Sequence, residues 1–177
     1  MKKGKIAGIG TGVAALLVTA AVLVSVNLNK TATLTLIPST QTVTDGENVS
    51  LTVGTVKQKQ FRRGIVGLTM DVAYDASRLT YVDIYSIAGD DFPAEANEGT
   101  PGIVSILMFP NSKDSLGKLP AVTGGGIFIL RFTVKPNAPA GEAAFTPSDC
   151  NFADYKNDDS GFELVAISGS PVSITVK

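Results

Sequence analysis

Acidic side chains are the groups in this sequence that come closest to a reactive or metal-binding site. They gather at 90–91, at 95–98 and at 154–159. Paired carboxylates can hydrolyse a glycosidic bond, and clustered carboxylate oxygens are the ligands that Ca²⁺ prefers. The stretch 154–159, however, lacks the alternating Asp-x-Asp-x-Asp-Gly pattern and the distal glutamate of a calcium-binding hand. We therefore interpret it as a solvated turn, and we predict no metal site.

Several other chemistries are excluded because the residues they need are absent. The 177 residues include no histidine, no tryptophan and one cysteine. This composition excludes a Ser-His-Asp triad, a histidine-ligated metal, a cysteine cluster and an intrachain disulfide. With no tryptophan and four tyrosines, few aromatic groups are available to stack on a sugar substrate. We predict a protein that is not an enzyme and has no cofactor, and we expect Cys150 to be a buried small apolar residue.

The charge balance says what kind of partner to expect. Fifteen Lys and Arg against sixteen Asp and Glu give a net charge of −1, which argues against a nucleic-acid binder. A local basic patch, formed by Lys57, Lys59, Arg62 and Arg63, precedes a predicted strand. A solvated loop is the favoured interpretation of this patch, and contact with anionic lipid or a wall polymer is the alternative.

The N-terminal region predicts a membrane anchor. Lysines occupy positions 2, 3 and 5, and the following run 6–26 is uncharged. As a helix this run is roughly 31 Å long, which matches the hydrocarbon core of a bilayer. The lysines that precede it place the N-terminus in the cytoplasm. We predict a cytoplasmic stub (1–5), a transmembrane signal anchor (6–26), a short linker (27–31) and an extracellular domain (32–177); secretion after cleavage is the alternative.

Residues 32–177 predict an all-β domain. Runs rich in Val, Ile, Thr, Phe and Tyr alternate with turn residues, as in antiparallel sandwiches. The predicted strands are nine: 32–37, 48–56, 65–74, 79–87, 103–109, 127–134, 142–145, 162–167 and 172–176. Two of them, 65–74 and 127–134, show apolar residues at alternate positions, which predicts their inward faces, whereas 103–109 is apolar on both sides except at Ser105. The expected core residues are Leu68, Met70, Val72, Val104, Ile106, Met108, Phe128, Leu130 and Phe132.

The ordered set of these segments resembles the cohesin family. The most distinctive of them, 67–79, is an alternating strand that ends in Tyr-Asp-x-x-x-Leu. The other matching segments are 51–54, 102–109, 126–135, 138–141, 152–154 and 172–176. The resemblance implies a nine-stranded antiparallel jelly-roll sandwich, related in fold to some carbohydrate-binding modules. It also implies that the strands equivalent to 65–74, 127–134 and 103–109 form a flat face that grips a dockerin module.

The resemblance makes the outward side of these three strands the candidate partner-binding face. An exposed apolar patch with charged members is typical of interaction sites. The predicted face consists of Ile65, Thr69, Asp71, Ser105, Leu107, Ile127, Ile129 and Arg131. The alternative is that a loop, 110–125, folds over this face and buries it.

Three functions are compatible with these features. The favoured one is a non-catalytic cell-surface module that binds a protein, either a dockerin-like module or another copy in a surface assembly. The second is a pilin-like structural subunit of a surface filament, because only 27–32 separates the predicted helix from the sandwich. The third is a glycan-binding adhesin, which rests on fold analogy alone.

Overall fold

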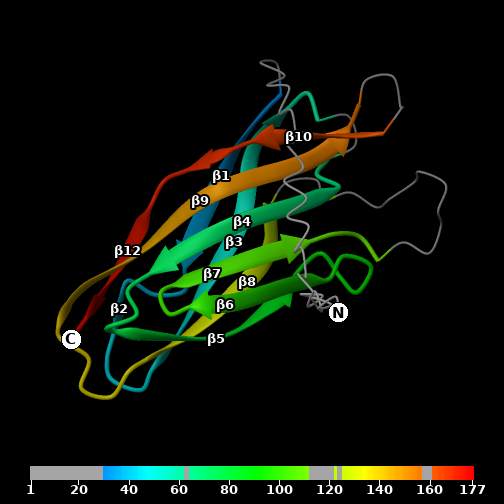
Figure 1. Cartoon of the computed structure of the whole chain (residues 1–177). Helices are drawn as coiled ribbons and strands as arrows, with labels where there is room; N and C mark the ends of the chain where they lie inside the picture. Colours follow the sequence, from blue (N-terminus) through cyan, green and yellow to red (C-terminus); the bar gives the residue numbers. More distant parts are fainter. Residues whose placement is uncertain (1–29, 62–63, 112–121, 123–124, 157–160) are drawn as a thin grey trace, which may run out of the picture.

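The computed structural model describes residues 30–61, 64–111, 122, 125–156 and 161–177. Every regular element in this part of the chain is a β-strand (Figure 1). The strands are β1 (Thr31–Pro38), β2 (Thr42–Val43), β3 (Asn48–Lys59), β4 (Gly67–Tyr74), β5 (Leu79–Ser86), β6 (Ala94–Thr100), β7 (Ile103–Met108), β8 (Gly125–Val134), β9 (Gly141–Tyr155), β10 (Phe162–Ala166), β11 (Ser168–Gly169) and β12 (Val172–Val176). No helix in these residues has the length and apolar character needed to span a membrane, and the predicted anchor 6–26 lies outside them.

The strands form two sheets that pack face to face (Figure 1). The five-stranded sheet has the order β11-β1-β3-β8-β5. The seven-stranded sheet has the order β2-β12-β9-β4-β7-β6, and β10 pairs with β9. All pairs are antiparallel except β1 with β11 and β12 with β2. The predicted all-β sandwich is confirmed.

Each of the nine predicted strands corresponds to an observed strand, and three strands were not predicted. Two of these, β2 and β11, have two residues each, too few to show alternation. The third, β6, has the sequence AEANEGT, whose Ala, Glu, Asn and Gly residues are poor strand formers. Its neighbour β7 supplies the hydrogen-bonding partner that holds β6 in the sheet.

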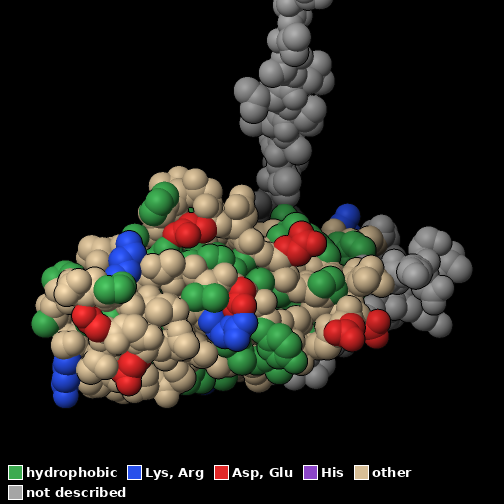
Figure 2. Space-filling view, turned by 90° about the horizontal axis from the view of Figure 1, so that it is seen from below, with side chains coloured by type: hydrophobic (Ala, Val, Ile, Leu, Met, Phe, Trp, Pro, Cys, Tyr) green, Lys and Arg blue, Asp and Glu red, His purple; other side chains and the backbone are tan. Residues whose placement is uncertain are grey.

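The core lies between the two sheets. All nine residues predicted to be in it are buried. Phe132 lies near its centre, with ring centroids 5.0 Å from those of both Tyr74 and Phe145. Cys150 is also buried, as predicted, and burial raises the pKa of its thiol to about 11. Some hydrophobic side chains nevertheless remain at the surface, where Figure 2 shows green clusters among sparse charged groups.

The position of β8 contradicts the predicted binding face. β8 lies between β3 and β5 in the five-stranded sheet, whereas β4 and β7 pair in the other sheet. The predicted adjacency of all three strands is therefore wrong. The reason is that alternation reports which side of a strand is apolar, and two strands with apolar sides can face each other across a core as readily as lie side by side.

Two members of the predicted face are core residues. Ile127 lies at an irregularity in the register of β8 with β3, between the pairs Val53–Phe128 and Gly54–Gly126. Because the extra residue of a β-bulge interrupts the alternation of sides, Ile127 and Phe128 are both buried. Ile65 precedes β4, bridges Val122 and joins the main hydrophobic cluster.

A buried ion cluster lies at the start of β1. Lys30 Nζ is 2.6 Å from Asp154 Oδ2, donates to the Tyr155 carbonyl oxygen at 3.0 Å and also pairs with Glu163. Burial alone would lower the pKa of Lys30, but the two carboxylates outweigh it and the pKa is raised. The predicted solvated turn is therefore wrong for Asp154, which is fully buried in β9. The segment 157–160 lies outside the described residues.

Candidate binding face

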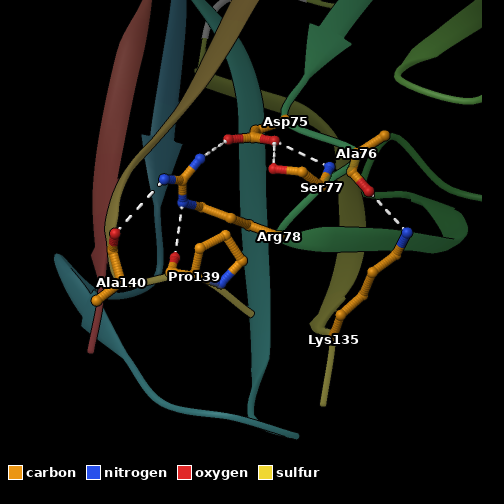
Figure 3. Close-up of polar contacts among 7 residues, drawn as sticks. All are labelled: Asp75, Ala76, Ser77, Arg78, Lys135, Pro139 and Ala140. Atoms are coloured by element: carbon orange, nitrogen blue, oxygen red, sulfur yellow. Dashed lines mark hydrogen bonds and ion pairs between the residues drawn. The ribbon is translucent and has the colours of Figure 1, made fainter. Parts of the chain in front are cut away.

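A polar corner follows β4, which lies between β9 and β7 in the seven-stranded sheet (Figure 3). The Asp75 carboxylate accepts a hydrogen bond from the Ser77 backbone N–H at 2.9 Å and pairs with Arg78. Arg78 Nε donates to the Pro139 carbonyl oxygen at 2.9 Å, in the loop between β8 and β9. Ser77 and Arg78 together lower the pKa of Asp75. The Tyr-Asp-x-x-x-Leu segment is thus a structural corner, where the chain leaves the seven-stranded sheet for β5 of the other sheet.

The outer face of the seven-stranded sheet is organised in cross-strand rows. One row consists of Leu107 and the residues aligned with it on the other strands from β6 to β9. The next row consists of Ser105 and the residues aligned with it. The members of the first row are Glu95, Leu107, Thr69 and Asn151, and those of the second are Asn97, Ser105, Asp71 and Ser148. Ile103 follows along β7, opposite Ala73. The apolar side chains Ile103 and Leu107 therefore lie along β7 with Ser105 between them, and the residues beside Ser105 and Leu107 on both neighbouring strands are polar.

An aromatic side chain closes one end of this face. A Cβ at Gly67 would lie 2.6 Å from the Phe109 ring, so the ring lies directly over the glycine. Phe109 nevertheless remains 46% exposed. A hollow of about 100 Å³, lined by Pro93, Glu95, Leu107 and Phe109, lies beside it. A larger, open hollow of about 310 Å³ lies next to it, along β6 and β7. The face thus offers shallow apolar depressions with carboxylate and amide groups at their edges.

The seven-stranded sheet is acidic. Its strands contain no lysine or arginine. Their acidic residues are Asp71, Glu95, Glu98, Glu142, Asp149, Asp154 and Glu163. Lys30 pairs with the last two, and Glu98 accepts a hydrogen bond from the Tyr74 hydroxyl, whose pKa is raised by burial and by this carboxylate. Asp71, Glu95, Glu142 and Asp149 remain without a cationic partner in these strands, and Asp71 and Glu95 lie in the two rows described above.

The structure brings together half of the predicted site residues. Thr69, Asp71, Ser105 and Leu107 lie on this face in two adjacent rows. Ile129 and Arg131, in contrast, lie on the five-stranded sheet, where Arg131 pairs with Asp83 of β5. Ile65 and Ile127 are buried.

Sequence reasoning missed the contribution of β6. Glu95 and Asn97 point outward beside β7, whereas Ala94 and Ala96 contact the core. The alternation of small and polar residues at 94–97 is the signal that could have identified this strand. It is weak because alanine contributes little to either strand propensity or burial.

The side chains of this face are of the kinds that make contacts with another surface. Among the described residues, no three acidic, cysteine or histidine side chains lie close enough to hold a metal ion. Exposed apolar side chains surrounded by polar groups are the arrangement found at protein interaction sites. The rigid sheet beneath them fixes their spacing before any partner arrives.

Comparison with known proteins identifies the family. Residues 33–171 match the family model described as Cohesin domain. CaCohA2 of Clostridium acetobutylicum, solved in complex with a CaDoc0917 variant, is 27% identical over 83% of this chain and all of its own, with a TM-score of 0.61.

Two further solved structures have lower identity and the same fold. The seventh ScaB type I cohesin of Pseudobacteroides cellulosolvens is 19% identical over 83% of this chain and 92% of its own, with a TM-score of 0.65. The sixth cohesin of scaffoldin B from Acetivibrio cellulolyticus, in complex with a Cel5 dockerin mutant, is 18% identical over 84% of this chain and 99% of its own, with a TM-score of 0.61. No curated protein matches this chain significantly. The match of the family model to most of the chain shows that the protein belongs to the cohesin family.

Proposed function

We propose that this protein is a non-catalytic binding module that captures a dockerin-like protein on the outer face of its seven-stranded sheet. The observation that carries the proposal is the line of exposed apolar side chains along β7, flanked by Thr69 and Asp71 on one side and by Glu95 and Asn97 on the other. The solved relatives named above include a cohesin in complex with a dockerin, which supports this class of partner.

The physical basis of the capture is a preformed surface. Leu107, Ile103 and Phe109 are exposed on a sheet whose opposite side is fully packed, so little ordering accompanies binding. Apolar contacts at the centre of the face supply the free energy, and the acidic groups at its edge select a partner with complementary charge.

We further propose that the module is held at the outer surface of a cell membrane by the apolar segment 6–26, with the N-terminus in the cytoplasm. The support is the lysine-flanked uncharged run, together with the position of Lys30. Lys30 follows that run within four residues and is fixed by two carboxylates and a carbonyl oxygen. This arrangement would keep the sandwich close to the bilayer.

The test compares two substitutions of equally exposed apolar residues. Leu107 and Val56 are both 42% exposed, the first on the candidate face and the second on β3 of the other sheet. We expect Leu107→Asp in the full chain to weaken capture of a panel of dockerin modules at least about tenfold, because a carboxylate would replace an apolar contact. Val56→Asp should leave capture unchanged, and both variants should unfold at nearly the wild-type temperature. Capture that survives Leu107→Asp would exclude this face.

A further inference from the structure

The outer face of the five-stranded sheet carries a second set of exposed apolar side chains. The strand register places four residues in one row across β1, β3, β8 and β5: Ile37, Thr52, Ile129 and Tyr85. Tyr85 is 63% exposed and Ile37 is 59% exposed, at the two ends of the row. Ile87 extends the patch, since a Cβ at Gly126 would lie 2.9 Å from the Ile87 Cδ1 atom. Apolar side chains therefore lie on β1, β8 and β5 across this face, with Thr52 among them on β3.

A charged pair lies beside this apolar row. The register places Arg131 of β8 between Ser50 of β3 and Asp83 of β5. The Arg131 guanidinium pairs with the Asp83 carboxylate, and their side chains remain 55% and 40% exposed. The pairing raises the pKa of Arg131 and lowers that of Asp83, so both groups are charged at neutral pH. Each group still has hydrogen-bonding capacity that faces solvent.

We propose that this face binds the same face of a second copy of the chain. A two-fold axis parallel to β5 and β8, midway between them, places Arg131 opposite Asp83 of the second copy and Ile129 opposite Tyr85 of the second copy. By symmetry each contact occurs twice, because a two-fold interface brings the same patch of both copies together. The two ion pairs then form a ring of alternating charge, with Ile129 and Tyr85 of both copies beside it, whereas Ile37 lies outside the contact because β5 is the edge strand of its sheet. The strands of the two packed sheets then have nearly the same direction, as in aligned β-sandwiches.

The charge pattern favours a second copy over a different partner. One cation and one anion make the patch neutral and complementary to itself. The acidic face of the other sheet has no lysine or arginine in its strands, so two copies of that face would repel each other. The contact is small, since two strands of about six residues cover roughly 10 Å by 20 Å. The pair is therefore weak and concentration-dependent, and it is favoured where copies are crowded together.

The test uses two charge-reversal variants, each of which repels its own copies but is complementary in charge to the other variant. Arg131→Asp makes both charged positions of the patch acidic, and Asp83→Arg makes both basic. We prepare each full-length variant with two different affinity tags and measure cross-linked co-capture of the tagged copies. Each variant alone should self-associate about tenfold less than wild type, because two attractive pairs become repulsive. A mixture of the two variants should restore association to the wild-type level or above.

Two controls separate this pairing from other effects. Lys156→Asp likewise reverses one positive charge, but at an exposed position outside the patch, and it should leave self-association unchanged. Thermal unfolding and dockerin capture should remain as in wild type for both patch variants, so this proposal and the proposed function can fail separately. Failure of the mixture to restore association would overturn the pairing. Self-association equal in all combinations would also overturn it, and would assign the contact to another part of the chain.

Discussion

The two outer faces of this sandwich differ in how they distribute apolar and charged groups. On the seven-stranded sheet, Ile103, Leu107 and Phe109 follow the direction of one strand, and the flanking charges are acidic. On the five-stranded sheet, the apolar row crosses four strands, and its charged neighbours, Arg131 and Asp83, cancel. The difference shows how one core supports two chemically distinct surfaces, because only every second residue of a strand is committed to packing.

The largest expected effect comes from the loss of the buried ion cluster, because both outer faces depend on the same folded sandwich. Lys30→Ala would leave Asp154 buried without its cation, a change that typically costs about 3–5 kcal/mol of unfolding free energy. Binding at both faces should fall together as the sandwich is destabilised. Lys59→Ala is the matched control, because Lys59 is exposed and its loss should change stability by about 0.5 kcal/mol or less. Denaturant unfolding measures both, and a stable Lys30→Ala variant would contradict the role of the ion cluster.

The second prediction compares neighbouring residues of β8 that point to opposite sides. Leu130 is fully buried, so Leu130→Ala should cost about 2–5 kcal/mol through lost contacts and a residual cavity. Ile129 lies on the outer face, so Ile129→Ala should cost about 1 kcal/mol or less. Ile129→Ala should instead reduce self-association. Equal stability losses for the two variants would show that the side assignment of β8 is wrong.

The third prediction tests whether the acidic edge of the seven-stranded sheet acts on the rate of capture. Glu95 lies in register with Leu107 at the border of the face. We expect Glu95→Gln to slow association with a dockerin-like module by about two- to fivefold at low salt, and to change the dissociation rate little. Surface plasmon resonance at two ionic strengths measures this effect. An unchanged association rate would mean that the partner carries no complementary charge near Glu95.

The last prediction concerns the corner that joins the two sheets. The pKa of Asp75 is lowered in the folded state, first by the hydrogen bonds of Ser77 and then by Arg78. Its contribution to stability is therefore present above the ordinary pKa of an aspartate and is lost as the pH falls through the folded-state value. Asp75→Asn should be about 1 kcal/mol less stable than wild type near pH 7, and the difference should shrink below about pH 4. A difference independent of pH would contradict this role of the carboxylate.

Sequence patterns predicted the inward half of this fold well. The alternation of Leu68, Met70 and Val72, and that of Phe128, Leu130 and Phe132, identified side chains that the structure buries. Half of the predicted face was also placed correctly, although the strand of Ser105 and Leu107 is apolar on both sides and its outward set was chosen only because Val104, Ile106 and Met108 suit a core. The rest of the face depends on β6, whose residues adopt a strand because β7 is available to pair with them.

The sequence by itself determined the all-β class, the apolar side of the strands at 65–74 and 127–134, and the family. These properties follow from local features, because a period of two and a turn residue act within a few positions of the chain. Only the tertiary structure decided that Arg131 meets Asp83 rather than Asp71, that Ile127 turns into the core, and that Lys30 neutralises Asp154. Sheet membership and register depend on backbone hydrogen bonds between distant segments, and the backbone groups that make them are the same in nearly every residue.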